Sequence, residues 1–273
     1  MSTEPEVVQV VKDSHIAEVW LSRPEAGNAL NAALFRELEE AFCALDADDE
    51  VRVAILLGEG KAFSYGLDLM AAPVDFGPVL QEGLAKERMD LRDLVLTLQR
   101  QCGAPAACRK PVIAAIHGWC IGGGLDLVAA CDLRLCSEDA RFSLREARVA
   151  MVADLGSLQR LPRIIGDAAT RELAFTAKDI DAQRALALGL VSQVLPDKDA
   201  LMTAARKEAE TIAALSPLVT RGIKQVLGFG EGRRLSDGLE YVASWNAAFL
   251  QSEDLKEAML AFMERRLPAY KGR

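Results

Sequence analysis

Residues 110–126 read KPVIAAIHGWCIGGGLD, and this stretch indicates the architecture of the chain. The run from Val112 to Ile116 is short and apolar throughout, which is typical of a strand buried in a parallel sheet. Three successive glycines then allow a tight turn, and the residues from Leu125 to Ala130 indicate the beginning of a helix. A buried strand, a glycine turn and a helix in this order predict an α/β protein.

The same kind of pattern extends along the chain in both directions. Val51 to Leu57 is a second continuous apolar run, and behind the good N-cap Asn31 the apolar residues recur at helical spacing. Lys12 to Ser14 is a turn that predicts an antiparallel pair of strands around it. The further predicted elements are strands over Val7 to Val11, Ile16 to Leu21, Leu133 to Cys136 and Arg141 to Ser143, and a helix from Pro78 to Gln101.

Beyond about residue 195 only helical patterns remain. Pro217, a glycine-rich segment at 228–232 and Pro268 divide them into four predicted helices: Asp197 to Leu215, Leu218 to Gly228, Leu235 to Leu250 and Asp254 to Arg266. We therefore predict a β/α region over residues 1–195 and a helical region over residues 196–273, joined in one continuous architecture. The many apolar positions in the second region favour docking on a neighbouring subunit.

The composition excludes several classes of protein. Of the 273 residues, 51% are hydrophobic and 26% are charged, which is too apolar for a disordered chain. The 40 acidic residues outnumber the 32 basic ones, and the net charge of -8 argues against a nucleic-acid surface built from clustered lysine and arginine. The longest apolar runs fall far short of the roughly 18 residues of a membrane span. We therefore expect no nucleic-acid partner and no membrane partner.

The six cysteines include no Cys-x-x-Cys pair, and only two histidines accompany them. Structural zinc needs about four closely spaced ligands, so we expect no metal site. Most of the cysteines lie in apolar stretches, which indicates buried free thiols of a reducing compartment. The first residues, MSTEPEVVQV, resemble neither a secretory signal nor a transit peptide, and the chain does not end in a peroxisomal signal, so the expected compartment is the cytoplasm.

Two glycine turns follow buried strands. One spans Phe63 to Leu69 and contains Gly66, and the other contains Gly122 to Gly124. Two such turns can bring two backbone N–H groups onto one carbonyl oxygen, which is the minimum for stabilising an enolate. A plainer interpretation is that both are tight loops, in which glycine supplies unusual φ values and Asp68 caps a helix.

Three carboxylates, Asp126, Glu146 and Asp154, follow the second turn. Apolar surroundings raise the pKa of a carboxyl group, and neighbouring carboxylates cannot all ionise freely, so one can hold a proton while another accepts one. Each carboxylate also has a structural interpretation. Asp126 would complement a helix dipole, Glu146 would pair with Arg145 or Arg148, and Asp154 would cap a helix that begins near Leu155.

Several motifs, taken in order and spacing, resemble the crotonase (enoyl-CoA hydratase/isomerase) superfamily over nearly the whole chain. They are the segments Arg23 to Leu30, Lys61 to Leu69, Lys110 to Gly118, Gly122 to Gly124 and Ala130 to Asp132. Within that superfamily the chain most resembles the delta(3,5)-delta(2,4)-dienoyl-CoA isomerases. The segments that carry this second resemblance are Gly122 to Val128, Ala153 to Pro162 and Tyr241 to Asn246.

The resemblance implies a spiral of ββα units with a C-terminal helical trimerisation region, assembled as a homotrimer or homohexamer. It implies an isomerase of fatty-acid β-oxidation that acts on an acyl-CoA thioester and needs no separate cofactor, because CoA is part of the substrate. The thioester oxygen would accept hydrogen bonds from the N–H groups of Leu67 and Gly123. The residues implied along the path of CoA and the acyl chain are Arg23, Ala26, Asn28, Leu30, Ser64, Tyr65, Gly66, Leu67, Asp68, Gly123 and Gly124.

The resemblance also implies how protons move. Asp154 would be the base that removes a proton from C2, Glu146 the acid that delivers one at C6, and Asp126 a supporting group beside them. The chemistry agrees, because an enolate that extends through a diene carries negative character to the remote C6 and requires an acid there. No water is needed for this reaction.

Two alternatives stay open. A hydratase of the same superfamily would use two glutamates, and Asp126 at the second position is one methylene shorter, which withdraws the carboxylate by about 1.5 Å. A non-catalytic or RNA-binding relative would have an exposed basic helix or would lack the carboxylates. The sequence has no basic helix of that kind, and all three carboxylates are present.

Overall fold

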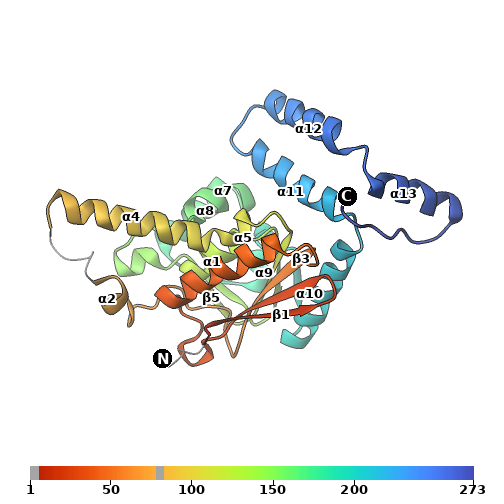
Figure 1. Ribbon diagram of the computed structural model, residues 1–273. Helices are drawn as coiled ribbons and strands as arrows, with labels where there is room; N and C mark the ends of the chain where they lie inside the picture. Colours follow the sequence, from red (N-terminus) through yellow and green to blue (C-terminus); the bar gives the residue numbers. More distant parts are fainter. Residues whose placement is uncertain (1–5, 78–82) are drawn as a thin grey trace, which may run out of the picture.

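The larger sheet of the computed structural model has six strands in the order β1-β2-β3-β4-β6-β9 (Figure 1). β1 and β2 form the predicted antiparallel pair, and every later pair of neighbours is parallel. The structure describes residues 6–77 and 83–273. The six strands span Val8–Asp13, Ile16–Leu21, Val53–Gly58, Val112–Ile116, Leu133–Ser137 and Gln193–Leu195.

Alternate residues of this sheet pack against two different layers of helices. On β3, Ala54 and Leu56 belong to the cluster that contains the buried face of α1 (Ala32–Ala47). Val53, Ile55 and Leu57 belong to the cluster on the opposite face, formed with α10 (Lys198–Ala213). Because both faces of the sheet are covered, its central strands are continuous apolar runs in the sequence.

A smaller sheet of three strands lies beside the glycine turns. It consists of β5 (Trp119–Ile121), β7 (Arg141–Ser143) and β8 (Ile180–Asp181), with β5 parallel to β7 and β7 antiparallel to β8. Two isolated bridges, Ser64 to Cys120 and Leu30 to Leu67, attach the loop around Gly66 to this sheet and to the loop before α1. The small sheet therefore joins the two glycine turns into one unit.

The remaining helices of the body surround these two sheets. Asn31 caps α1 as predicted, since its Oδ1 accepts a hydrogen bond from the N–H of Leu34 at 2.9 Å. α4 begins at Ala85, and the predicted beginning of this helix at 78–82 lies outside the described residues. The other elements are η1 (Pro24–Ala26), α2 (Ala72–Asp75), α4 (Ala85–Cys102), α5 (Ala104–Ala107), α6 (Gly123–Ala129), η2 (Glu146–Val149), α7 (Ser157–Ile164), α8 (Asp167–Thr176) and α9 (Ala182–Leu188).

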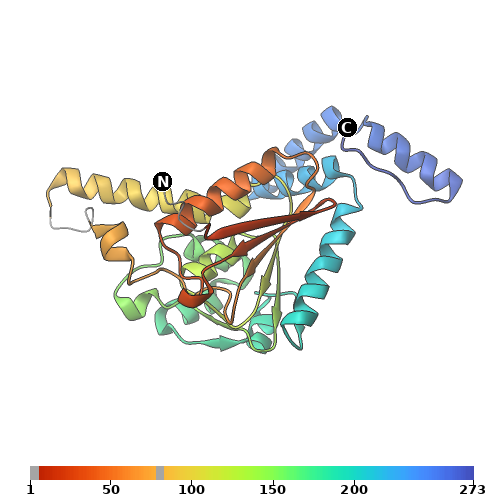
Figure 2. The same ribbon diagram turned by 60° about the horizontal axis from the view of Figure 1, so that its bottom comes forward.

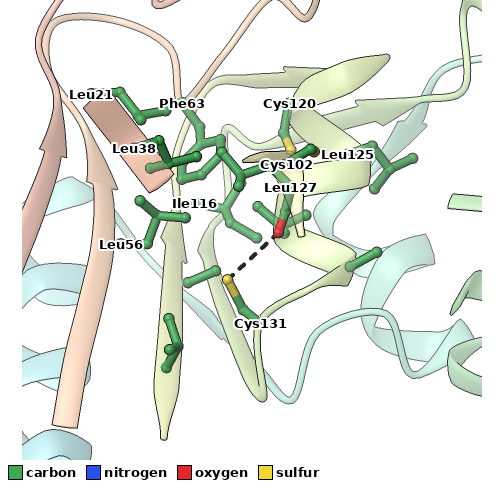
Figure 3. Packing of buried hydrophobic residues seen from close by; sticks show 14 of the residues in the cluster. Leu21, Leu38, Leu56, Phe63, Cys102, Ile116, Cys120, Leu125, Leu127 and Cys131 are labelled. Carbon is green, nitrogen blue, oxygen red and sulfur yellow. Dashed lines mark hydrogen bonds between the residues drawn. The ribbon is translucent and has the colours of Figure 1, made fainter. Parts of the chain in front are cut away.

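The core between α1, the sheet and α6 contains leucine, isoleucine, phenylalanine and cysteine side chains (Figure 3). Cys102, Cys120 and Cys131 are buried there, and the Cys131 thiol lies 3.6 Å from the carbonyl oxygen of Leu127. All six cysteines of the chain are free, and Cys43 alone among them is exposed. Burial raises the pKa of the Cys102 and Cys120 thiols well above the ordinary value, so they remain protonated packing groups.

The last three helices are α11 (Pro217–Gly230), α12 (Leu235–Phe249) and α13 (Glu253–Glu264). Lys224 of α11 is hydrogen-bonded to the carbonyl oxygens of Pro105 and Lys110 in the body, whereas α12 and α13 extend away from it in both views (Figures 1 and 2). α10, the first helix after the predicted boundary at residue 195, packs instead on the large sheet. The division into 1–195 and 196–273 stays a prediction. Across residues 6–77 and 83–273, no helix combines the length and the apolar character that crossing a membrane requires.

Candidate active site

The two glycine turns meet in the fold. The N–H of Ser64 donates to the carbonyl oxygen of Trp119 at 2.9 Å, and the N–H of Ile121 donates to the carbonyl oxygen of Ser64 at 3.1 Å. Gly66 has φ +81°, and a Cβ added there would lie 2.6 Å from the oxygen of Ile121 and 3.2 Å from the nitrogen of Gly123. Only glycine permits both this backbone conformation and this close approach.

Two backbone N–H groups lie side by side at this junction. The nitrogen of Leu67 is 3.7 Å from the point that a Cβ on Gly123 would occupy. Within the described part of the chain, neither the N–H of Leu67 nor that of Gly123 donates a hydrogen bond. Two unused amides in such proximity form the arrangement that stabilises a developing oxyanion.

A cavity of ≈ 300 Å³ opens in front of these amides. Its wall is mainly apolar and carries one carboxylate and two guanidinium groups, from Tyr65, Leu67, Leu69, Ile121, Gly122, Gly123, Arg145, Glu146, Arg148, Val149 and Met151. A second cavity, of ≈ 710 Å³, is lined by residues 24–27, residues 60–62 and Tyr65. Tyr65 belongs to both walls, so the two spaces adjoin at this side chain.

Glu146 lines the first cavity at the start of η2. A Cβ on Gly122 would lie 3.4 Å from its Oε1, which places the carboxyl group beside the second glycine turn. Its Oε2 is buried and, among residues 6–77 and 83–273, has no hydrogen-bond partner. Burial, reinforced by the charges of Asp126 and Asp154, raises the pKa of Glu146 to about 7. This carboxyl group therefore exchanges its proton near neutral pH.

Asp126 lies behind the cavity in the first turn of α6 and is 1% exposed. Its Oδ1 accepts a hydrogen bond from the N–H of Ser157, the first residue of α7. Burial raises the pKa of Asp126 to about 6 despite the hydrogen bond from the N–H of Ser157, and the charge of Asp154 also raises it. Asp126 thus holds the N-terminus of α7, and the interpretation of Asp154 as the cap of this helix is wrong.

Asp154 lies in the segment between η2 and α7 and is exposed in the isolated chain. It is absent from the wall of the ≈ 300 Å³ cavity, which Glu146 lines. Partial desolvation raises its pKa, and its charge acts on both Glu146 and Asp126. The three carboxylates therefore form one electrostatically coupled group.

Several residues predicted to bind substrate hold the loops of the site together instead of lining a cavity. Asn28 is completely buried and donates to the carbonyl oxygens of Glu59 and Ala62 at 2.9 and 2.8 Å. Ser64 is also completely buried, with its hydroxyl donating to the carbonyl oxygen of Asn28 at 2.8 Å and accepting from the N–H of Gly66 at 3.1 Å. These two side chains fix the path of the first glycine turn.

Arg23 and Asp68 form an ion pair at 3.0 Å, with both side chains mostly buried. Asp68 also accepts hydrogen bonds from the N–H groups of Met70 and Ala71 in the turn before α2. The N-cap of α2 is Ala71, so the interpretation of Asp68 as a helix cap is wrong. Leu30 contacts the position of Gly123, and Gly124 packs against Ser64. Of the predicted path residues, Ala26, Tyr65, Leu67 and Gly123 line the two cavities.

Around the carboxylates the structure shows contacts that the sequence did not predict. Arg145 and Arg148 line the cavity, but both pair with Asp179, at 2.9 and 3.5 Å. The structural interpretation of Glu146 as a partner of either arginine is therefore wrong. Arg145 also stacks over the ring of Trp119 at 4.7 Å. Ser157 and Gln99 contact the predicted catalytic residues from α7 and α4. Among these residues, only Ser157 had a local signal in the sequence. It follows Gly156 and precedes a helical run, which indicates the start of a helix.

No group of three or more histidine, cysteine, aspartate and glutamate side chains in the described ranges is arranged to hold a metal ion.

The chain is similar to known proteins over nearly all of its length. It is 41% identical to the mitochondrial Delta(3,5)-Delta(2,4)-dienoyl-CoA isomerase of Rattus norvegicus over 263 residues, which cover 96% of this chain and 80% of that one. It is 43% identical to the peroxisomal Delta(3,5)-Delta(2,4)-dienoyl-CoA isomerase of Arabidopsis thaliana over 266 residues, which cover 97% and 96% of the two chains. The solved structure of an enoyl-CoA hydratase from Bacillus anthracis has a TM-score of 0.89 at 32% identity and covers 98% of this chain and 100% of that one.

These similarities confirm the predicted superfamily and its α/β spiral fold. The family described as Enoyl-CoA hydratase/isomerase matches residues 12–273. With that match and two relatives above 40% identity, this chain belongs to the enoyl-CoA hydratase/isomerase family.

Proposed function

We propose that this chain isomerises a 3,5-dienoyl-CoA to the conjugated 2,4-dienoyl-CoA. The observation that carries the proposal is the buried Oε2 of Glu146, which has no hydrogen-bond partner in the described ranges and lies on a side chain that lines the same cavity as the amides of Leu67 and Gly123. A protonated acid with a free oxygen beside an oxyanion site suits proton delivery to a dienolate. The relatives named as dienoyl-CoA isomerases support the same reaction.

In the proposed mechanism the thioester oxygen accepts hydrogen bonds from Leu67 and Gly123 as negative charge develops on it. Asp154 removes a proton from C2, and the electron pair delocalises through the diene to C6. Glu146 then delivers its proton to C6. One proton leaves the substrate and one arrives, so its formula is unchanged, and both carboxyl groups return to their starting states by exchange with solvent. Asp126 holds α7 in place and keeps the pKa of Glu146 high.

The first test is a spectroscopic assay. Purified protein mixed with a 3,5-dienoyl-CoA should develop the ultraviolet absorbance of the conjugated 2,4-isomer without added nucleotide or metal.

The variant Asp154→Asn should lower kcat by about 10²- to 10⁴-fold, the range for removal of a general acid or base. Asp167→Asn, at an exposed position on α8, is the matched control and should retain full activity. Turnover of Asp154→Asn near the wild-type rate would remove Asp154 from the mechanism.

A hydratase is the second candidate, because the Bacillus anthracis structure that this chain resembles is named a hydratase. The surroundings of Asp126 argue against it. One oxygen of this shorter carboxylate is occupied by the N–H of Ser157, and the side chain is almost completely buried. Rapid hydration of crotonyl-CoA, with no change in the dienoyl substrate, would favour the hydratase over the isomerase.

We also propose that the chain assembles as a homotrimer or homohexamer. Large apolar side chains on or beside α12 and α13 are exposed in the single chain, including Leu235, Phe262 and Leu267 at 80%, 82% and 90%. Exposed apolar surface of this kind marks contacts between subunits.

The proposed compartment is the cytoplasm, supported by six free cysteines, whereas the relatives named above are mitochondrial and peroxisomal.

A further inference from the structure

The segment that carries Asp154 has little support of its own. Val152 to Leu155 connects η2 to α7 and, within the described residues, makes no hydrogen bond between backbone groups. Ala153 and Leu155 are each 8% exposed and anchor it by packing, whereas Val152 is 77% exposed. Because no backbone hydrogen bond holds these peptide groups, side-chain hydrogen bonds to them are the polar contacts that can fix their orientation.

Two side chains supply those contacts. The Nε2 of Gln99, from α4, donates to the carbonyl oxygen of Asp154 at 2.7 Å. The Nη1 of Arg160, from α7, donates to the carbonyl oxygen of Leu155 at 3.4 Å. The first distance is that of a strong hydrogen bond and the second lies at the limit of one. Gln99 is therefore the principal polar contact of this segment.

α4 is a rigid support for the hydrogen bond from Gln99. Its final turn is fixed by Cys102, which is completely buried, and by Leu98, which packs against the main core. The helix also contacts α1 and α6, and α6 carries Asp126. Gln99 lies within this fixed turn. Its amide therefore joins the segment that carries Asp154 to α4, which packs on the helix that begins at the second glycine turn.

We propose that Gln99 is a positioning residue that holds Asp154 at the correct distance and orientation from C2 of the substrate. This inference rests on the proposed function, in which Asp154 is the base. A general base acts only within hydrogen-bond reach of the proton that it removes, and a misplacement of about 1 Å can cost about 10²-fold in rate. Without the amide of Gln99, the peptide of Asp154 can rotate and the carboxylate moves with it.

The test compares two substitutions with a matched control. Gln99→Leu removes the hydrogen bond, and Gln99→Glu keeps the size of the side chain but, when ionised, has no N–H to donate. Both should lower kcat for the dienoyl substrate by about 10- to 100-fold, with KM within about twofold of the wild type, because the thioester contacts are unchanged. Gln101→Leu, two residues away on the same helix, is the control and should retain the wild-type kcat. Of these two glutamines of α4, Gln99 is the one that donates to the segment that carries Asp154.

A double substitution separates positioning from a general loss of structure. If Gln99 acts through Asp154, then adding Gln99→Leu to Asp154→Asn should lower kcat no further. A multiplicative loss in the double variant, or a kcat for Gln99→Leu and Gln99→Glu equal to that of the wild type, would overturn the proposal.

Crystal structures provide a measurement that does not depend on turnover. In Gln99→Leu the backbone at Asp154 should shift by about 1 Å or lose defined density, and in Gln101→Leu it should match the wild type. An unchanged, well-ordered Asp154 in Gln99→Leu would contradict the inference. If the wild-type chain fails to isomerise the dienoyl substrate, the proposed function fails, and this structural comparison still decides whether Gln99 holds the segment.

Discussion

Glu146 is a carboxylic acid that loses its proton near neutral pH because it is buried beside two other carboxylates. Its ordinary pKa of 4.5 is raised to about 7, chiefly by desolvation. If Glu146 donates a proton to C6, the active enzyme is the form in which it is protonated. Asp154 must be ionised in the same form, so activity also falls at low pH.

Glu146→Gln tests this role through the pH profile. We expect the kcat/KM of the wild type to fall as pH rises above about 7, by about tenfold per pH unit. The variant should be about 10²- to 10⁴-fold less active, and its residual activity should no longer fall at alkaline pH because the titrating acid is gone. The measurement is the rate of isomerisation from about pH 5 to 9. An alkaline fall that persists in the variant would assign the titration to another group.

Glu146→Gln should lower activity, but at alkaline pH it should favour stability relative to the wild type. The folded state binds the Glu146 proton more tightly than the unfolded state, so wild-type stability from this group is complete below about pH 4.5 and is lost as pH rises to about 7. The Glu146→Gln variant has no titrating group at this position and therefore has no such loss. The difference in Tm between variant and wild type should move in favour of the variant from about pH 5 to about pH 8. A difference independent of pH would contradict the raised pKa.

The sequence identified the three carboxylates but not their partners. The arginines that flank Glu146 pair with Asp179, which is 34 residues from Arg145 and comes close only through the pairing of β7 with β8. Gln99 is 55 residues from Asp154. No local pattern encodes contacts of this kind, because they depend on how separate elements pack.

At the scale of elements, apolar runs were reliable guides, and the cap Asn31 was predicted correctly. The run Val112 to Ile116 is β4 with the predicted bounds, and the continuous pattern of β3 reflects the helices on both of its faces. The start of α7 was harder to predict. The helix begins at Ser157 and its first N–H is satisfied by Asp126, 31 residues earlier. A cap supplied by another element leaves no local signal, so the nearby Asp154 was the obvious but wrong candidate.

The cap on α7 can be tested with two substitutions. Asp126→Ala leaves the N–H of Ser157 buried without an acceptor, which should cost about 1 to 3 kcal/mol in the free energy of unfolding. Asp126→Asn keeps an oxygen acceptor and removes a buried negative charge, so it should be clearly more stable than the alanine variant. Urea denaturation at about pH 8, above the raised pKa of Asp126, measures both. Equal loss in the two variants would show that the hydrogen bond to Ser157 is unimportant.

At the scale of the whole molecule, the helical C-terminal region was predicted from the sequence, while its geometry was not. α10 packs on the sheet through Leu201, Ala205 and Ala209, whereas α12 has no buried residue. Both helices are amphipathic, and the periodicity of a sequence does not distinguish a face that packs within the chain from a face that is left for another subunit.

Substitution of Phe262 tests the proposed assembly. In solution the wild type should have the mass of at least three 29.5 kDa chains, about 88 kDa, by light scattering. Phe262→Asp places a charge on the exposed apolar face of α13 and should shift the mass toward that of a single chain. Glu264→Asp, at an exposed position on the same helix, is the control and should keep the wild-type mass. A wild type that has the mass of one chain would contradict the assembly.

The two amides in front of the cavity belong to the main chain, and the groups proposed to move protons are side chains. Apart from a change to proline, no substitution deletes the amide N–H of Leu67 or Gly123, whereas each carboxylate can be replaced by a single codon change. In the proposed function, the scaffold would thus separate what thioester reactions share, a held carbonyl, from what distinguishes them, the placement of protons. On the same proposal, moving a few acids would change the reaction, whereas a methyl group on Gly66 would clash with Ile121 and Gly123 and disturb both amides at once.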